Sequence, residues 1–307
     1  MKARLAKKGE RPEERKSPDG LLTGQAAADR LHLPQTHVRE PLMNYEDLVL
    51  EVARDVATVI LNRPEKLNAL NRGLQLEILR VCAELKSRDD VRAVVWTGAG
   101  RGFCSGADLT GPRPAAAEQI PWQQVMDEDS WVGRQARAVY LIDKPTIAAV
   151  NGVAAGAGMS LALACDIRLG SENTRFKTVF IERALAPDAG MTYFLPRIVG
   201  TGNAMDLILS SRSVQSEEAL RMGLLQRVVP HNSLMDEAMA LANQIAAFPP
   251  LAAMMSKRSV QHSLDADFDD QLRYEIRAIE IGRRAPNDAK ESAAAFVEKR
   301  VPKYTGS

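Results

Sequence analysis

The sequence predicts an α/β fold with a largely parallel sheet, followed by a helical C-terminal region. Short apolar runs rich in β-branched residues alternate with longer segments of helical spacing, which is typical of β-α-β units with right-handed crossovers. Beyond residue 216 the spacing is helical throughout. The predicted strands are 48–54, 56–61, 91–97, 146–150 and 165–169.

Composition and charge are those of an ordinary globular protein. The 307 residues are 45% apolar and 26% charged, and a net charge of +1 argues against a general nucleic-acid binder. Cys82, Cys104 and Cys165 lie far apart, without the spacing of a disulfide framework or a zinc site. With no secretory signal pattern at the N-terminus, we expect a cytoplasmic protein without a membrane span or a metal site.

Three regions are predicted along the chain. Residues 1–42 combine charges and prolines with few apolar residues, which indicates a disordered or loosely attached leader. Residues 43–247 hold the alternating strands and helices of the core. Residues 248–307 form a C-terminal helical region, which begins with the chain break Phe248-Pro249-Pro250. The apolar face of its helix 265–284 consists of Phe268, Leu272, Ile276 and Ile279.

Local sequence signals predict the first hairpin and the first helix of the core. The two first strands are joined tightly, which predicts a β-hairpin. The polar loop that follows ends at Asn71, a suitable N-cap for a helix with apolar spacing from Leu74 to Leu85.

The glycine-rich loop 98–109 follows the next predicted strand. It fails the G-x-G-x-x-G dinucleotide pattern, because Phe103 stands where the third glycine is needed. Its backbone N–H groups are free to face a ligand, and the spacing alone does not name that ligand.

The segment from Lys144 to Arg168 organises the rest of the chain. Its strand ends at the turn signal Asn151-Gly152, and the small residues at 156–158 open an apolar helix. Small residues let a ligand approach the backbone, and the first N–H groups of a helix are unpaired donors at the positive end of its dipole. This turn therefore predicts an oxyanion-binding site.

Three other interpretations of this segment are open. It is also compatible with a buried core helix, in which glycine serves close packing. As a membrane span it is broken by the turn and barely long enough. A serine-hydrolase elbow around Ser160 would need a histidine, and no pattern places one of the four histidines near it.

A further candidate is Asp188, which stands in apolar company within the stretch 186–192. Its alternative role is an N-cap for the helix after Pro187.

Four motifs, in this order, resemble the enoyl-CoA hydratase/isomerase, or crotonase, family. The resemblance runs from Tyr45 to Tyr304. It implies a crotonase-like spiral of ββα units, a C-terminal helical trimerisation region, and a homotrimer or a hexamer made of two trimers. It also implies an acyl-CoA thioester substrate, with coenzyme A as part of the substrate and no separate cofactor. The motifs are Arg63-Pro64-Glu65-Lys66-Leu67-Asn68-Ala69-Leu70, Gly102-Phe103-Cys104-Ser105-Gly106-Ala107-Asp108-Leu109, Asn151-Gly152-Val153-Ala154-Ala155-Gly156-Ala157-Gly158 and Pro187-Asp188-Ala189-Gly190.

The same resemblance implies roles for individual residues. The N–H groups of Ser105 and Ala157 would form an oxyanion hole for the thioester carbonyl, beside Gly156. Lys66 and Leu67 match the nucleotide-binding loop. The residues implied to lie against pantetheine and adenine are Gly106, Ala107 and Asp108.

The departures from the family pattern decide the predicted reaction. Hydratases of the family hold the attacking water between two glutamates, whose positions here are occupied by Ser160 and Phe180. Asp188 instead matches the isomerases that shift a double bond in enoyl-CoA or act on ring-derived phenylacetyl-CoA intermediates. Apolar neighbours such as Phe180, Met191 and Tyr193 would raise the pKa of Asp188. The resemblance therefore predicts an isomerase with one catalytic carboxylate.

Several other functions stay open. Glu182 lies two residues beyond the second glutamate position and, with Asp188, would restore an enoyl-CoA hydratase. Ser160 would position a water for thioester hydrolysis, and a dehalogenase would use Asp188 as its nucleophile. A non-catalytic relative would bind acyl-CoA or RNA.

Overall fold

The computed structural model describes residues 43–110 and 129–307. The predicted leader, residues 1–42, lies outside the described residues.

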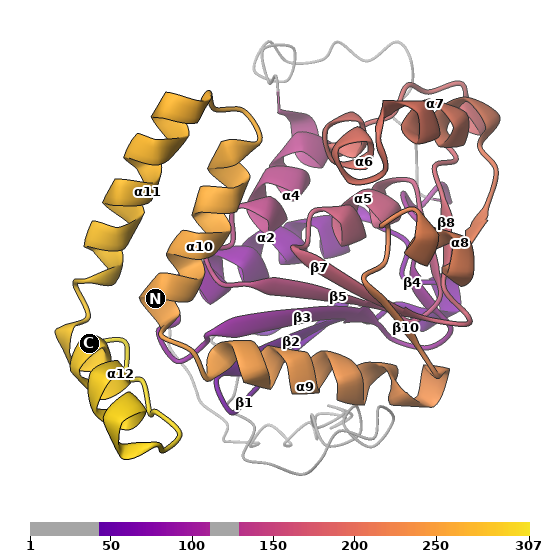
Figure 1. Ribbon diagram of the computed structural model, residues 1–307. Helices are drawn as coiled ribbons and strands as arrows, with labels where there is room; N and C mark the ends of the chain where they lie inside the picture. The colour runs from indigo at the N-terminus through magenta and orange to yellow at the C-terminus, as the bar shows by residue number, and fades with distance from the viewer. Residues whose placement is uncertain (1–42, 111–128) are drawn as a thin grey trace, which may run out of the picture. The chain divides into compact units, whose positions relative to one another are not determined.

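The main sheet has six strands in the order β1-β2-β3-β5-β7-β10 (Figure 1). Strands β1 and β2 form the predicted antiparallel hairpin, and every other pairing in this sheet is parallel. The prediction of a largely parallel α/β core is therefore confirmed. The prediction that the chain is helical throughout beyond residue 216 is wrong, because β10, a strand of only three residues, pairs with β7 there. The strands are Leu48–Ala53, Val56–Leu61, Ala93–Gly98, Thr146–Val150, Ile167–Ser171 and Arg227–Val229.

A second sheet, in the order β4-β6-β8-β9, was not predicted. Its strands have only two or three residues each, too few to show an alternating pattern. β6 lies between the predicted turn and the predicted helix, so the chain makes a second strand before the helix begins. The strands are Gly102–Cys104, Val153–Ala155, Arg175–Lys177 and Val214–Gln215.

Helices cover both faces of the main sheet (Figure 1). One face packs on α2, α4 and α5, and the other on α9. Asn71 caps α2 as predicted, because its side-chain oxygen accepts a hydrogen bond from Leu74 N–H at 2.7 Å. These helices are Arg72–Ser87, Ser130–Tyr140, Ala157–Leu163 and Leu234–Ala246. The helices beside the second sheet are α6 (Met191–Val199), α7 (Thr201–Ser210) and α8 (Ser216–Arg221).

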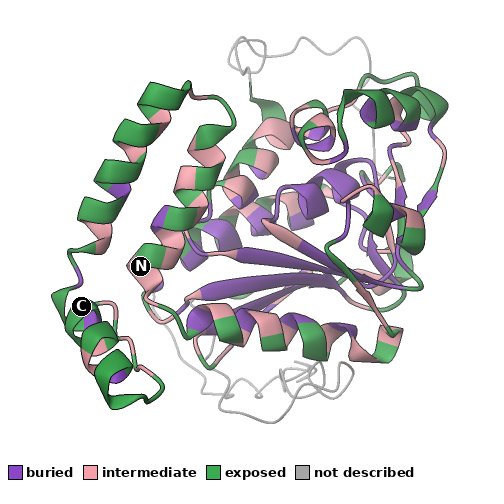
Figure 2. Cartoon of the chain, in the orientation of Figure 1, coloured by how far each residue is buried: buried purple, intermediate pink, exposed green. Residues whose placement is uncertain are grey.

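The C-terminal region consists of α10 (Pro250–Ser263), α11 (Phe268–Gly282) and α12 (Pro286–Glu298). α10 is tied to the core by an ion pair between Lys257 and Asp166 at 2.8 Å. α11 packs beside α10, and its outer face is exposed (Figure 2). This face holds the predicted apolar residues, whose exposed fractions are 76% for Phe268, 43% for Leu272, 59% for Ile276 and 57% for Ile279.

No single helix in the described ranges is long and apolar enough to cross a membrane. Two neighbouring segments, His231–Ala246 and Pro250–Ser263, reach that length and composition together, with a bend of 107° between them.

The approach of α5 to β4 gives the first testable prediction. A Cβ atom added at Gly158 would lie 2.2 Å from the carbonyl O of Cys104 and 2.7 Å from its carbonyl C, so Gly158→Ala forces two backbone segments apart. We expect a loss of about 1–3 kcal/mol in the free energy of unfolding, measured by urea denaturation. The control is Gly202→Ala in α7, where a Cβ meets nothing within 4 Å and the helix should gain stability. Equal stability of the Gly158 variant and wild type would contradict this packing.

Candidate active site

The predicted oxyanion turn connects β6 to α5. Gly156 has a φ of 50° at the bend, a conformation that glycine adopts without strain. The next residue, Ala157, begins the helix and is 4% exposed. Its N–H group donates to no acceptor among the described residues, so a buried donor is available to a ligand.

The loop that carries Ser105 lies against this turn. Gly106 has a φ of 95°, and a Cβ atom added there would lie 2.8 Å from Ala155 O and 3.7 Å from Ala157 N. The structure thus brings the two predicted donor residues together. However, Ser105 N–H already donates to Leu67 O at 3.0 Å. A substrate oxygen would have to share this N–H with Leu67.

The predicted nucleotide-binding loop is held in an unusual backbone conformation. Leu67 and Asn68 both have positive φ angles, of 50° and 55°. Such a conformation costs about 1–3 kcal/mol of conformational free energy per residue and persists only where the surrounding structure enforces it. The Asn68 side chain does so by donating to Ala99 O at 3.0 Å and to Gly102 O at 2.8 Å. Lys66, at the end of the short 3-10 helix Pro64–Lys66, is exposed, and its ammonium pairs with no described residue.

Asp108 has a different setting from Ala107. Ala107 is exposed, whereas the Asp108 carboxylate bonds to Thr110 and pairs with Arg63 at 3.0 Å. These contacts, those to Thr110 first, hold the pKa of Asp108 at about 2. Arg63 opens one of the four motifs, but no signal in the motif predicts a role for its side chain.

Asp188 contacts the first turn of α5 through its main chain. The Ser160 hydroxyl, in the first turn of α5, donates to the main-chain O of Asp188 at 3.4 Å. The Asp188 Oδ1 atom is buried and has no hydrogen-bond partner among the described residues. Burial raises the pKa of Asp188 above its usual range.

The alternative role of Asp188 as an N-cap is wrong. α6 begins at Met191, and its cap position is occupied by Gly190 with a φ of 80°. No side chain caps this helix, because the turn at Gly190 separates Asp188 from the first helical N–H groups.

Aromatic side chains pack beside the oxyanion turn and beside the segment that carries Asp188. Phe180 is 6% exposed, and its ring carbon Cζ would lie 3.9 Å from a Cβ atom added at Gly156. The Phe194 ring lies against Gly190, 2.6 Å from where a Cβ atom would be. The surroundings of both segments are therefore apolar.

Glu182 is not brought to Asp188 by any described contact. It lies exposed on the short 3-10 helix Ile181–Arg183 and pairs with Lys177 at 2.6 Å. Hydrogen bonding to Lys177 lowers the pKa of Glu182. Its environment is therefore opposite to that of Asp188.

No histidine of the described residues lies at Ser160. His231 Nδ1 is 3.1 Å from the buried Ser171 Oγ, and His262 bonds to Gln271. The described residues thus offer no histidine base for the serine-hydrolase interpretation. The described residues also contain no cluster of three or more His, Cys, Asp or Glu side chains that could hold a metal ion.

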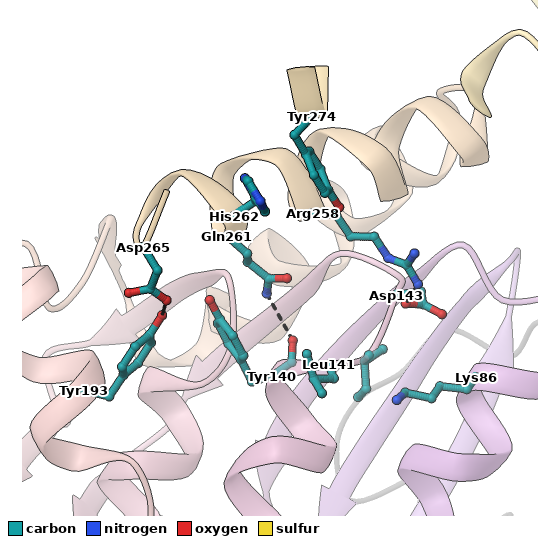
Figure 3. A pocket seen from close by; sticks show the side chains of 11 residues that line it. Lys86, Tyr140, Leu141, Asp143, Tyr193, Arg258, Gln261, His262, Asp265 and Tyr274 are labelled. Carbon is teal, nitrogen blue, oxygen red and sulfur yellow. Dashed lines mark hydrogen bonds and ion pairs between the residues drawn. The ribbon is translucent and has the colours of Figure 1, made fainter. Parts of the chain in front are cut away.

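A groove of about 490 Å³ runs between α10 and the core (Figure 3). Tyr193 donates from its hydroxyl to Asp265 at 2.9 Å, and Gln261 donates to Tyr140 O at 3.0 Å across the groove. The rings of Tyr140 and Phe194 are 5.3 Å apart, so an aromatic layer lies between this groove and the segment that carries Asp188.

Comparison with known proteins agrees with this architecture. The family model described as "Enoyl-CoA hydratase/isomerase" matches residues 51–307. A short-chain-enoyl-CoA hydratase of Clostridium acetobutylicum is 35% identical over 84% of this chain and 97% of its own. A 1,2-epoxyphenylacetyl-CoA isomerase of Escherichia coli is 34% identical over 85% of this chain and 99% of its own. The crystal structure of an enoyl-CoA hydratase from Bacillus anthracis has a TM-score of 0.78 and 33% identity, and covers 85% of this chain and 100% of that one.

The fold and the glycine-rich strand-to-helix turn place the protein in the class of crotonase-fold acyl-CoA enzymes. The chain belongs to the enoyl-CoA hydratase/isomerase family. The resemblance seen in the sequence is thereby confirmed.

The environment of Asp188 gives the second prediction. Because its pKa is raised on folding, the folded state favours the protonated carboxyl, and the ionised form lowers stability at neutral pH. We expect Asp188→Asn to raise the free energy of unfolding at pH 7, measured with urea. The gain should vanish below about pH 4, where the carboxyl is protonated in both states.

The matched control is Asp166→Asn. Asp166 accepts hydrogen bonds from Thr146 N and Oγ1 at 2.7 and 2.8 Å and pairs with Lys257. Its loss should therefore lower stability at pH 7, by about 1–3 kcal/mol. A loss of the same size in Asp188→Asn would show that the Asp188 carboxylate is well paired.

Proposed function

We propose that this protein is an enoyl-CoA isomerase that moves a double bond in an acyl-CoA thioester by proton transfer through Asp188. The observation that carries this proposal is the setting of Asp188, whose main-chain O accepts from Ser160 in the first turn of α5. Its half-buried carboxylate has a raised pKa and one oxygen with no partner among the described residues. A poorly solvated carboxylate with a raised pKa is a stronger base than an ordinary aspartate.

The proposed reaction needs one base and two N–H donors. The thioester oxygen accepts from Ala157 N–H and shares Ser105 N–H with Leu67. Asp188 takes a proton from C2 of a 3-enoyl-CoA, and the negative charge spreads to the thioester oxygen as a dienolate. The protonated Asp188 then returns this proton to C4, so the double bond moves from C3–C4 to C2–C3. One oxyanion donor typically contributes about 10²–10³ in rate.

The binding of coenzyme A is proposed to use the loop before Asn68. Lys66 is exposed and unpaired among the described residues, so its ammonium is free to meet a phosphate as a point charge. Leu67, Gly106 and exposed Ala107 would line the pantetheine path. The Asp108 carboxylate is already paired with Arg63. It would therefore shape the pantetheine path by holding Arg63 in place.

Enoyl-CoA hydratase is the second candidate, since the similar proteins include a short-chain-enoyl-CoA hydratase. Hydration needs a carboxylate to activate the water. By the resemblance the two glutamate positions hold Ser160 and Phe180, and Glu182 is exposed and paired with Lys177. The similarity to the 1,2-epoxyphenylacetyl-CoA isomerase supports the isomerase.

The third prediction tests the reaction directly. Purified protein given a linear 3-enoyl-CoA should form a product of unchanged mass with the double bond in conjugation, detected by mass spectrometry and ultraviolet absorbance. Asp188→Asn should lower kcat by about 10²–10⁴, because the base is lost, while acyl-CoA binding is nearly unchanged. Glu182→Gln should retain the wild-type rate.

Two results would contradict this proposal. A product heavier by one water, together with lost activity in Glu182→Gln, would identify a hydratase. Full activity of Asp188→Asn would remove Asp188 from the mechanism.

We also propose that the chain assembles as a homotrimer or as a hexamer of two trimers. The apolar residues Phe268, Leu272, Ile276 and Ile279 of α11 are all exposed, and contiguous apolar patches mark interaction surfaces. Because a cyclic trimer is closed by heterologous contacts, the α11 face of each subunit would pack on a different surface of the next subunit.

The fourth prediction concerns this assembly. Light scattering after size-exclusion chromatography should give three or six times the chain mass of 33.6 kDa. Ile276→Asp places a charge on the α11 face and should lower the measured mass, because a buried unpaired carboxylate is costly. Leu76→Asp, at an exposed position of α2, is the control and should leave the mass unchanged. A wild-type mass of one chain would contradict the proposal.

A further inference from the structure

The side chain of Arg63 connects three separate parts of the described chain. Its guanidinium donates to the Asp108 carboxylate at 3.0 Å and to the carbonyl O of Ala69, and its Nε lies 3.6 Å from an Asp47 oxygen. The side chains of Arg63 and Asp108 are only 12% and 10% exposed. A planar guanidinium with several fixed partners, largely shielded from water, holds them more rigidly than a surface pair does.

Two of these partners belong to a short ladder that includes the Ser105 amide. The ladder pairs the loop after Arg63 with the loop after Cys104, and it lies outside both sheets. So short a pairing depends on tertiary support. Arg63 bridges the two sides, since Ala69 is on one and Asp108 on the other. The hydrogen bonds are Ser105 N to Leu67 O at 3.0 Å, Leu70 N to Gly106 O at 2.8 Å and Asp108 N to Leu70 O at 3.1 Å.

The position of the Ser105 amide therefore has two supports. On one side the ladder holds it to Leu67 O. On the other side Gly106 lies in close contact with Ala155 O, next to Ala157 N. An oxygen that accepts from Ala157 N–H meets Ser105 N–H only while the ladder keeps this register. If the ladder loosens, one donor remains well placed and the other does not.

We propose that Arg63 is a positioning residue for the oxyanion site. It touches neither the thioester nor Asp188 in this inference, and it acts by fixing the ladder that orients Ser105 N–H. This inference rests on the proposed function, because it assumes that a thioester oxygen binds between Ser105 and Ala157. Without substrate, Ser105 N–H donates to Leu67 O alone. When the substrate binds, this N–H would form a three-centre hydrogen bond in which the substrate oxygen is the second acceptor.

The test must distinguish a general loss of stability in the Arg63 variant from a displacement of Ser105 N–H. Arg88 is a matched control, because it is 6% exposed and pairs with Asp90 at 2.7 Å and with Glu84 at 3.3 Å, at the end of α2. Lysine at either position keeps the charge and loses the fork geometry. Arg88→Lys should thus lower stability by a similar mechanism without touching the ladder.

The fifth prediction uses the thioester carbonyl as its own reporter. Butyryl-CoA with ¹³C at the carbonyl is bound to the full chain, and infrared difference spectra give the C=O stretch. Two good donors polarise the bond and lower its frequency in the wild-type complex. In Arg63→Lys we expect a smaller shift, with kcat for the 3-enoyl-CoA lower by about 10- to 10²-fold and KM changed much less. Arg88→Lys should keep both the wild-type shift and the wild-type kcat.

The outcomes are distinct. A wild-type shift that is unchanged or larger in Arg63→Lys overturns the positioning role while leaving the proposed function intact. No shift in the wild type itself overturns the oxyanion site and with it the role of Arg63. If Arg63→Lys does not fold, Asp108→Asn is measured in its place, because it removes the charge at the far side of the ladder and keeps a side-chain oxygen. The same reduced shift is expected there, and an unchanged one overturns the proposal.

Discussion

The structure depends on the close approach of two backbone segments, the loop around Cys104 and the turn that begins α5. Gly158 lies against the Cys104 carbonyl, and Gly106 lies against the Ala155 carbonyl, at distances that leave no room for a Cβ atom. Any side chain at these two positions would separate the second sheet from the helix. This contact also brings Gly106, the residue after Ser105, next to the Ala157 amide. Packing and the proposed chemistry thus impose the same requirement on the same glycines.

The Asp188 region shows the opposite relation between stability and function. A buried carboxylate oxygen without a partner destabilises the fold, and nothing in the described surroundings compensates for it. The charged residues nearby in sequence are satisfied, as the Glu182 pair with Lys177 shows. A protein that satisfies an exposed carboxylate and leaves a half-buried one unpaired keeps the second in a reactive state. Strain of this kind is common where a base has to be available.

The sequence predicted the elements whose signals are local. Apolar runs predicted the strands of the main sheet except β10, which has three residues in a stretch predicted to be helical. Asn71 predicted the start of α2, and the small residues at 156–158 predicted the helix start that offers Ala157 N–H. The second sheet was not predicted because its strands are too short to show a periodic pattern. The contacts of Arg63 were not predicted because its partners lie 6 and 45 residues away. Likewise, only three-dimensional packing shows that Glu182 faces Lys177 and that the Asp188 Oδ1 atom has no partner among the described residues.

The C-terminal helices are linked to the Asp188 segment through α6. α6 begins three residues after Asp188, and its side chains Tyr193 and Arg197 both bond to Asp265, at 2.9 Å each, in the connection between α10 and α11. Arg197 also lies over the Tyr193 ring, 3.8 Å from its centre. Because these groups are partly exposed, each contact alone contributes little. If the apolar face of α11 packs on another copy of the chain, the connection becomes fixed, and α6 and the Asp188 segment are fixed with it. Assembly would then order the site, since Asp265 links the start of α11, whose apolar face is proposed to meet a second subunit, to the helix that follows Asp188.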